Sequence, residues 1–465
     1  MSKLKKMGQW LDDRLGYTEN VLPLLKHLAP PRAKWTYVFG SATLFCLILQ
    51  VVTGVALSLL YQPSSSQAYQ SLNFISNQAK FGSVLRGIHF FGASAMIVMV
   101  GLHMIRVYIF AAYKYPREMS WVSGVVLLLL TIAMGFTGQL LRWDSNGVWS
   151  AVVAAEQMGR MPIIGKYIAR LLLGGDTIGG HSLSRFYSYH VFLFPAIMFA
   201  LVGLHLYLVF RNGISEPPKA GRQVDPKTYR KWYGDMLKEK GVPFWPDAAW
   251  RDTLFGALVV IAVVALAVVV GPPSLTSPPD PSHITTNPAP DWYMIPFFAL
   301  FALMPPRIES WVIFLAPPIL IILMLILPFL SNKGERSPIK RPWAVFGVIC
   351  VLIFMTCLLV IGLKAPWSPV FDAKPLPLSA IRGNQQDSTI QKGAHLFYMK
   401  GCEYCHQING YGGFKGPNLT YVGNRLDLSL ITIRIVNGGP DMPSFGGTLS
   451  KNDLDALTVF LAAQK

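Results

Sequence analysis

Seven long apolar stretches constrain the fold of this 465-residue chain more than any other feature of its sequence. A helix needs roughly 20 apolar residues to cross a lipid bilayer, and each stretch approaches that length. They run over residues 37–60, 88–110, 122–141, 191–210, 253–270, 311–330 and 345–363. Hydrophobic residues make up 52% of the chain and charged residues only 14%, which excludes an ordinary soluble protein. The sequence therefore predicts an all-α fold built on a polytopic membrane helix bundle.

The positive residues behind the net charge of +17 are concentrated in alternate segments between these spans. Lys and Arg are dense before the first span and in the fourth and sixth loops, and they are sparser in the loops between. Cytoplasmic segments of membrane proteins carry this excess, so we expect a cytoplasmic N-terminus and, after seven spans, an external C-terminus. We also expect no removable signal peptide in the N-terminal segment. The basic charge indicates topology, and we expect no nucleic-acid partner.

Two of the spans each carry two histidines at nearly the same interval. His89 and His103 are fourteen residues apart, and His190 and His205 are fifteen apart. At about 3.6 residues per turn this interval is close to four turns, so both histidines of a helix lie on one face. One such residue alone is more typical of a hydrogen-bonded core histidine. Four in matched positions predict two hemes, an outer one held by His89 and His190 and an inner one held by His103 and His205.

Glycines and arginines near these histidines fit the same hypothesis. The first and third spans carry glycines at the same fourteen-residue interval: Gly40, Gly54, Gly124 and Gly138. Generic helix packing also uses small residues, but the shared interval favours clearance for a flat macrocycle. Heme propionates need cations or hydrogen-bond donors. The candidates close to a histidine in the sequence are Arg86, Arg106 and Arg185. The alternative is that these arginines only extend to the membrane surface.

The polar C-terminal segment, which follows a Pro-rich stretch, carries a second kind of motif. In CEYCH, Cys402 and Cys405 can form thioethers to heme, and His406 can bind its iron. A CxxC pair alone could also bind zinc or act as a redox pair. The adjacent histidine and the absence of another such pair favour one covalent heme c. We expect Met442, in a Gly- and Pro-rich loop, to be the sixth ligand in preference to Met399.

Together with these motifs, the sequence from about residue 22 to 363 resembles the cytochrome b/b6 family. The segments that carry the resemblance are RGIHFF, GLHMIRVY, PREMSWVSGV, MPIIGKY, RFYSYH and PDWY. The fifteen-residue histidine interval and the seven spans resemble the plastid-type cytochrome b joined to its subunit IV. The C-terminal segment, with GPNL at residues 416–419, resembles a small class I cytochrome c. The resemblance implies an outer quinol oxidation pocket, formed by the third loop and PDWY, and an inner quinone reduction site.

Two departures from the family pattern concern this chemistry. The family has a glutamate where this chain has Asp291, which is one methylene shorter but still able to take a proton from quinol, with Tyr293 as its aromatic partner. The alternative is that Asp291 is an ordinary polar loop residue. Plastid-type relatives attach an extra heme to a cysteine that aligns with Val38, and valine cannot form this bond. We therefore expect two hemes b and no covalent heme within the membrane, with Cys46 as a packing residue.

The resemblance also implies a division of the chain into four segments. Residues 1–212 are expected to form a cytochrome b domain with four spans and two hemes b, and residues 213–365 a subunit IV-like domain with three spans. Residues 366–384 are expected to be a linker. Residues 385–465 are expected to form a small α-helical cytochrome c domain.

The expected function is that of a quinol:cytochrome c oxidoreductase subunit in a bacterial cytoplasmic membrane, with the cytochrome c domain outside. Quinol would be oxidised at the outer site, with electrons passing inward through the hemes b and outward to heme c, coupled to proton translocation. The sequence has no second Cys/His set for an iron–sulfur cluster, so the Rieske protein must be a separate partner. A cytochrome c-type acceptor and a homodimeric complex are further expectations. The rival hypotheses are a heme-bearing anchor and conduit for a dehydrogenase, and a scaffold that has lost its hemes.

Overall fold

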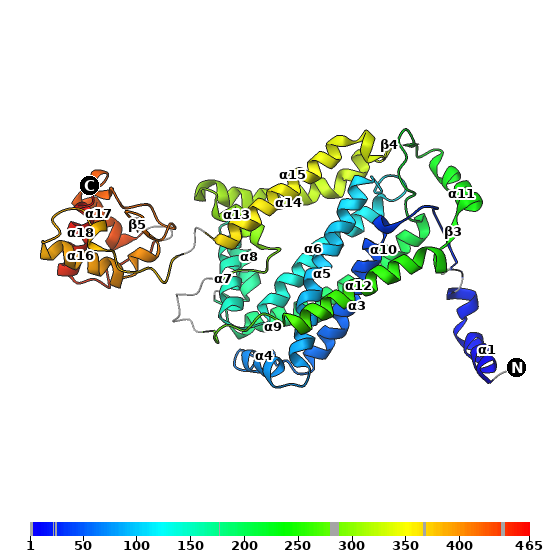
Figure 1. The fold of residues 1–465 in the computed structure, drawn as a ribbon, viewed down its shortest axis with the longest axis horizontal. Coiled ribbons are helices and arrows are strands. Elements are labelled where there is room, and N and C mark those ends of the chain that lie inside the picture. The colour runs from blue at the N-terminus through cyan, green and yellow to red at the C-terminus, as the bar shows by residue number, and fades with distance from the viewer. Residues whose placement is uncertain are drawn as a thin grey trace. The chain divides into compact units, whose positions relative to one another are not determined.

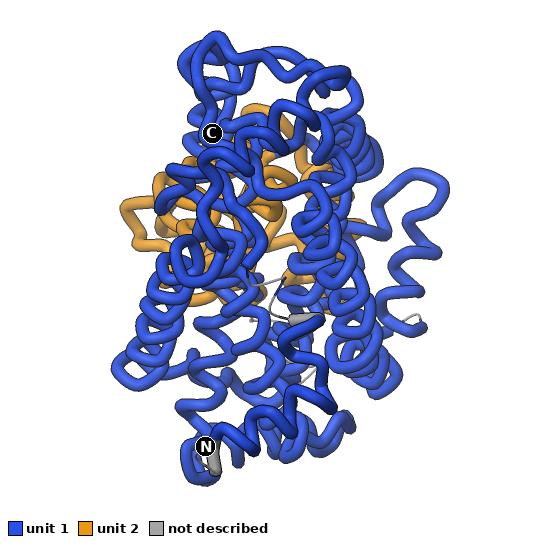
Figure 2. Tube along the Cα trace, turned by 90° about the vertical axis from the view of Figure 1, so that its right-hand side faces the viewer, with its two compact units in different colours: residues 1–281, 288–294, 304–356 blue, residues 282–287, 295–303, 357–465 orange. Residues whose placement is uncertain are grey.

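The computed structural model describes residues 3–21, 23, 26–175, 177–279, 288–365, 369–438 and 442–465. The chain is mainly helical and separates into two compact units, which Figure 2 shows in different colours. Unit 1 comprises residues 1–281, 288–294 and 304–356, and unit 2 comprises residues 282–287, 295–303 and 357–465. The start of the expected linker, residues 366–368, lies outside the described residues.

Seven helical segments of the described chain are long and apolar enough to cross a membrane, which confirms the expected fold class. Four of them are α3 (Phe39–Ser58), α5 (Gly82–Ile109), α6 (Glu118–Leu140) and the segment Gly180–Asn212, formed by α9 (Gly180–Ser188), η3 (Tyr189–Leu193) and α10 (Phe194–Asn212). The others are Phe244–Val269, formed by η4 (Phe244–Ala248) and α12 (Ala249–Val269), then α14 (Pro306–Leu330) and α15 (Pro342–Lys364).

The spans of unit 1 pack through small residues and flexible apolar side chains. Figure 1 shows α3, α5 and α12 side by side, and α10 and α14 each pack on α6. Cys46 of α3 is fully buried and clusters with Met96 of α5 and Met198 of α10. Close approach of α5 to α12 depends on Gly87, where a Cβ would lie 3.0 Å from the Cβ of Ala267. Small residues at such crossings are typical of membrane bundles.

Short strands pair the segments that the sequence predicts to share one side of the membrane. β1 (Leu28–Ala29) is antiparallel to β3 (Val242–Pro243), and β2 (Gln223–Val224) is antiparallel to β4 (Gly334–Glu335). The remaining elements of unit 1 outside the spans are α1 (Lys3–Leu15), η1 (Tyr17–Val21), η2 (Trp35–Tyr37), α4 (Ala68–Asn77), α7 (Ser145–Gly159), α8 (Gly165–Leu173), α11 (Tyr229–Lys240) and η5 (Pro338–Lys340). The third loop thus folds into two helices, α7 and α8, which pack on each other.

Unit 2 contains α13 (Ile295–Ala302), the end of α15 and a small helical domain. The elements of this domain are η6 (Leu378–Ala380), α16 (Ser388–Met399), η7 (Cys402–Tyr404), β5 (Gln407–Ile408), β6 (Tyr411–Gly412), η8 (Val422–Asn424), α17 (Leu428–Asn437) and α18 (Lys451–Ala462). β5 and β6 form an antiparallel pair. Its core is the crossing of α16 and α18, where Phe397 contacts Phe460 and Gly393 lies against the Ala456 backbone. This crossing places η7 and its motif at the end of α16.

Candidate functional site

The four membrane histidines meet in two pairs. The ring centres of His89 and His190 lie 6.3 Å apart, and those of His103 and His205 lie 6.5 Å apart. The two rings of each pair are nearly perpendicular, at 81° and 78°. The structure therefore brings together the same partners that the sequence paired, each joining α5 to the segment formed by η3 and α10.

The gap within each pair is the size that a shared metal ion requires. A metal–imidazole bond is about 2 Å long, and the ring centre lies about 1 Å beyond the nitrogen, so two imidazoles on one ion have centres roughly 6 Å apart. Both observed separations are close to this value. The rings are thus spaced for an ion between them.

Hydroxyl groups on neighbouring helices orient three of the four imidazoles. Thr53 Oγ1 lies 2.9 Å from His89 Nδ1, and Ser123 Oγ lies 2.9 Å from His205 Nδ1. The third contact joins Thr137 Oγ1 to His190 Nδ1 at 3.2 Å. A histidine that binds a metal usually engages its other ring nitrogen in this way. With Nδ1 engaged, Nε2 is the nitrogen left for a metal.

Each of the four glycines faces one of the histidines. The nearest distances from a Cβ built on the glycine to the imidazole are 2.6 Å for Gly138 to His190, 3.0 Å for Gly40 to His103, 3.2 Å for Gly54 to His89 and 3.6 Å for Gly124 to His205. A side chain at three of these positions would displace the ring. The glycines therefore clear space for the histidines themselves, in addition to the space that the sequence predicted for a macrocycle.

The three candidate arginines differ in their surroundings. Arg86 donates to Ser76 Oγ and to the Pro273 carbonyl, and Arg185 donates to the Leu171 carbonyl. The guanidinium of Arg106 stacks 3.6 Å from the ring centre of Tyr37, and its Nε and Nη2 atoms are buried without a hydrogen-bond partner among the described residues. Buried donors are normally satisfied, so Arg106 is the arginine best suited to an anionic group beside His103.

The PDWY loop is held against the helix that also contacts the first histidine pair. The backbone N–H of Asp291 donates to Gln139 Oε1, and the Tyr293 hydroxyl donates to Asp291 Oδ2 at 3.0 Å. A Cβ at Gly135 of α6 would lie 2.5 Å from the same hydroxyl. Gly135 and Gly138 are one turn apart on α6, so Tyr293 and His190 contact neighbouring turns of one helix. The loop and the pair formed by His89 and His190 thus form one region.

Burial sets the protonation of the two groups in this loop. Burial raises the pKa of the Asp291 carboxyl, although the Tyr293 hydrogen bond and the charge of Arg142 oppose this shift. Burial also raises the pKa of Tyr293, and the neighbouring carboxylate raises it further. Tyr293 therefore remains a neutral donor, while Asp291 is a carboxyl group poised to exchange a proton more easily than an exposed aspartate.

Sequence reasoning missed the residues that fix this loop. Asn146 of α7 accepts from the Ala289 N–H and donates to the Ala289 carbonyl. The fully buried carboxylate of Asp144 caps α7 at Gly147, pairs with Arg142 at 2.6 Å and accepts from the Thr276 N–H. These contacts join the third and fifth loops. The sequence signal was an Asp three residues before Gly147, a pattern typical of a helix N-cap.

In unit 2, the CEYCH motif presents one histidine nitrogen for binding. His406 Nδ1 lies 2.9 Å from the Pro417 carbonyl, so Nδ1 carries the proton and Nε2 is available. Gly416 leaves room for the ring, since a Cβ there would lie 2.5 Å from it. Burial raises the pKa of Cys402 to about 12 and also raises that of Cys405. Redox-active cysteine pairs have lowered thiol pKa values, so this environment does not favour that alternative.

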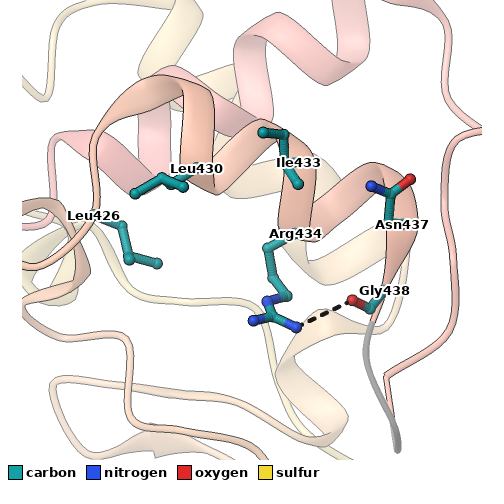
Figure 3. Close-up of a pocket in the computed structure, with 6 residues that line it drawn as sticks. All are labelled: Leu426, Leu430, Ile433, Arg434, Asn437 and Gly438. Atoms are coloured by element: carbon teal, nitrogen blue, oxygen red, sulfur yellow. Dashed lines mark hydrogen bonds between the residues drawn. The ribbon is translucent and has the colours of Figure 1, made fainter.

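A cavity of 320 Å³ lies on α17 of the same domain. Its lining, drawn in Figure 3, consists of Leu426, Leu430, Ile433, Arg434, Asn437 and Gly438. Leu430 and Ile433 are about half exposed there, whereas Ile431 and Ile435 of the same helix are buried in the core. Arg434 donates to the Gly438 carbonyl at 3.3 Å. Gly438 in turn lies against the Met442 carbonyl, so the loop of the candidate sixth ligand starts at this cavity.

This fold and these sites define a class of protein: a multi-pass membrane protein with two paired-imidazole sites and a CxxCH domain. The comparisons with known families agree. The model "Cytochrome b/b6/petB" matches residues 24–213, and "Cytochrome b(C-terminal)/b6/petD" matches residues 278–374. The model "Cytochrome C oxidase, cbb3-type, subunit III" matches residues 388–461. The chain belongs to the cytochrome b/b6 family and carries a cytochrome c domain, and both families bind heme.

Individual relatives support this assignment. Cytochrome b6 from Synechococcus sp. (strain JA-3-3Ab) is 37% identical over 214 residues, which is 46% of this chain and the full length of that protein. Cytochrome b6 from Synechococcus elongatus is 36% identical over the same length. The solved structure "Hyperthermophilic respiratory Complex III" has a TM-score of 0.65 and 29% identity, covering 76% of this chain and 90% of that one. The similarity to cytochrome b6 thus covers the N-terminal half, and the structural similarity extends well beyond it.

Proposed function

We propose that this chain is the cytochrome b/c fusion subunit of a quinol:cytochrome c oxidoreductase that oxidises quinol at an outer site and translocates protons. Membership of the cytochrome b/b6 family supports a role in quinol oxidation. The appended cytochrome c domain supports a one-chain arrangement in which the electron acceptor is tethered to the complex.

The observation that carries the proposal is the spacing of the two imidazole pairs, 6.3 Å and 6.5 Å between ring centres. We propose that His89 and His190 hold one heme b and that His103 and His205 hold the other. Gly40, Gly54, Gly124 and Gly138 keep the space beside these rings open. Bound hemes would supply one-electron carriers at two depths of the membrane.

Further residues are proposed to bind and orient these groups. Thr53, Ser123 and Thr137 hold the imidazoles through Nδ1. Arg106 offers two nitrogen atoms without a partner among the described residues, Nε and Nη2, to a propionate of the inner heme. Arg86 and Arg185 are weaker candidates, because protein carbonyls already accept from them. In the C-terminal domain, Cys402 and Cys405 would attach one heme c, with His406 and Met442 as axial ligands.

The quinol oxidation site is proposed to lie at Asp291 and Tyr293. A quinol hydroxyl must lose its proton as the electrons leave, and a nearby carboxylate can accept it. The raised pKa of Asp291 brings its proton affinity closer to that of a general base working near neutral pH. Tyr293 donates to the carboxylate and fixes its orientation. Gln139 and Asn146 hold the loop against α6 and α7.

The proposal also includes the topology of the chain, its division into domains and its partners. The N-terminus would be cytoplasmic, and the cytochrome c domain would lie on the outer side of a bacterial membrane. The division at residues 212, 365 and 384 gives two membrane domains, a linker and the cytochrome c domain. The partners would be a separate Rieske protein, a cytochrome c-type acceptor and a second copy of the complex.

Quinol oxidation by the purified complex tests the proposal against the conduit hypothesis. We expect reduction of the chain's hemes by added quinol to be blocked by inhibitors of the outer site and by Asp291→Asn. A conduit has no use for a carboxyl group in an anchored loop beside the first histidine pair. Heme reduction that needs a partner dehydrogenase and is insensitive to both treatments would overturn the proposal.

A further inference from the structure

A second cavity, unrelated to the histidine pairs, opens where α10 ends. It has a volume of 360 Å³ and lies between α11, β1 and the last turn of α10. Its lining includes the cationic side chains of Arg211 and Arg230 and the ring of His27. None of the residues that line it is Asp or Glu. The cavity is therefore electropositive, and its chemistry favours an anion.

The guanidinium groups of Arg211 and Arg230 form hydrogen bonds to neutral groups. Arg230 donates to the Tyr115 hydroxyl at 3.1 Å and to Asn212 Oδ1 at 3.4 Å. Arg211 donates to the Tyr207 hydroxyl at 3.4 Å. Neither has an ion-pair partner in the part of the chain that the structure describes. Both groups thus keep their charge and N–H donors for a ligand in the cavity.

The walls of the cavity are fixed by a buried network. Arg117 donates to the Tyr229 hydroxyl and to the carbonyls of Asn212, Gly213 and Ile214. The Tyr233 hydroxyl also donates to the Ile214 carbonyl at 2.7 Å. These bonds satisfy the carbonyl groups of residues 212–214, where the chain leaves α10. The end of α10 and the start of α11 are therefore held together, and the walls of the cavity are preformed.

The surface below the cavity distinguishes a lipid from a free anion. Phe210 lines the cavity and is 45% exposed, and Tyr207 and Leu204 continue the same exposed apolar surface along the span. His27 extends this wall, because its ring contacts Phe210 and stacks on Phe244. Arginines above an exposed apolar helix face at the end of a span match a phosphate headgroup with acyl chains below it. We propose that this cavity binds the phosphate headgroup of an anionic phospholipid.

Lipid retention by the purified complex tests this site. The complex is delipidated in detergent and offered short-chain phosphatidylglycerol, and native mass spectrometry counts the bound lipid. Arg211→Gln combined with Arg230→Gln is expected to weaken retention by about tenfold or more, since two charge-assisted contacts are lost. Arg222→Gln is the matched control, because Arg222 belongs to the same basic loop but stacks on Trp232 outside the cavity. Unchanged heme b content shows that the variants are folded.

Two competition experiments decide the identity of the ligand. Phosphatidylcholine of the same chain length should compete poorly, and inorganic phosphate at equal concentration should not displace phosphatidylglycerol. Equal retention by the double variant and the control overturns the proposal. Displacement by inorganic phosphate also overturns it, because the site would then take a diffusible anion.

Discussion

Each membrane histidine lies against a glycine, and three of the four also contact a hydroxyl residue. In these three cases the hydroxyl residue directly precedes the glycine, as in Thr53–Gly54, Ser123–Gly124 and Thr137–Gly138. The glycine gives the imidazole room, and the hydroxyl forms a hydrogen bond with its Nδ1. The histidines and glycines could be found from their interval. The hydroxyl partners could not, because a helical interval gives no angle between neighbouring helices, although their position beside the glycines was the available signal.

The contact distances predict a graded effect of alanine at the four glycines. Gly138→Ala places a Cβ 2.6 Å from the His190 ring, so we expect it to lose most of one heme b. Gly40→Ala and Gly54→Ala should lose less, and Gly124→Ala, at 3.6 Å, should stay close to wild type. Overpacking of this kind costs about 1–3 kcal/mol. Pyridine hemochrome quantitation of heme b per chain measures the series.

Two glycines on α5 and α10, the helices packed against α3 and α6, serve as controls for this series. A Cβ at Gly101 or Gly203 meets nothing within 4 Å, so alanine there should leave the heme b content unchanged. A uniform loss at all six positions, or no loss at Gly138, would contradict the assigned role of these glycines.

Asp291 should govern the pH dependence of quinol oxidation. Burial raises the pKa of its carboxyl, and only the ionised form accepts a proton. The rate should therefore fall as pH falls through this raised pKa and be fully developed above it. Asp291→Asn should slow oxidation by about 10²–10⁴-fold and remove this limb of the profile, whereas Asp291→Glu should retain it. An asparagine variant with the wild-type rate and profile would exclude Asp291 as the proton acceptor.

Among the elements, α6 contacts both the His89–His190 pair and the PDWY loop, the proposed sites of heme binding and quinol oxidation. It presents Gly138 to His190 and, one turn earlier, Gly135 to Tyr293. The seven spans followed directly from the apolar stretches, because a bilayer demands helices of one length. The position of the PDWY loop against α6 and α7 could not be predicted from the sequence. It depends on hydrogen bonds between residues about 140–150 positions apart, such as Asn146 with Ala289.

The crossing of α16 and α18 should control heme c independently of the membrane sites. Gly393→Val would force a side chain into the Ala456 backbone and Phe460, so we expect the C-terminal domain to lose about 1–3 kcal/mol of stability and much of its heme c. Heme b should be unaffected. Gly447→Val is the control, because nothing lies within 4 Å of that position. Equal heme c in both variants, measured by heme staining and spectra, would contradict the role of this crossing.

At the scale of the whole molecule, the two kinds of histidine motif lie in different compact units. Unit 1 carries both histidine pairs and the PDWY loop, and unit 2 carries CEYCH and Met442 together with α13 and the end of α15. The motifs separated the membrane histidines from CEYCH in the sequence, because a c-type attachment motif and spans with matched histidines need different environments. They did not place α13 and the end of α15 in unit 2. The lining of the cavity at α10 was not visible, since it combines β1, the end of α10 and α11, which are far apart in the sequence.

Heme counting in paired histidine variants tests the central claim most directly. The wild-type chain should contain two hemes b and one heme c. His89→Leu and His190→Leu should each remove one heme b, and their combination should remove no more, because both residues hold the same group. His89→Leu combined with His205→Leu should remove both hemes b and leave heme c intact. If the His89 and His190 double variant lost both hemes b, while the His89 and His205 double variant retained one, the pairing of the ligands would be wrong.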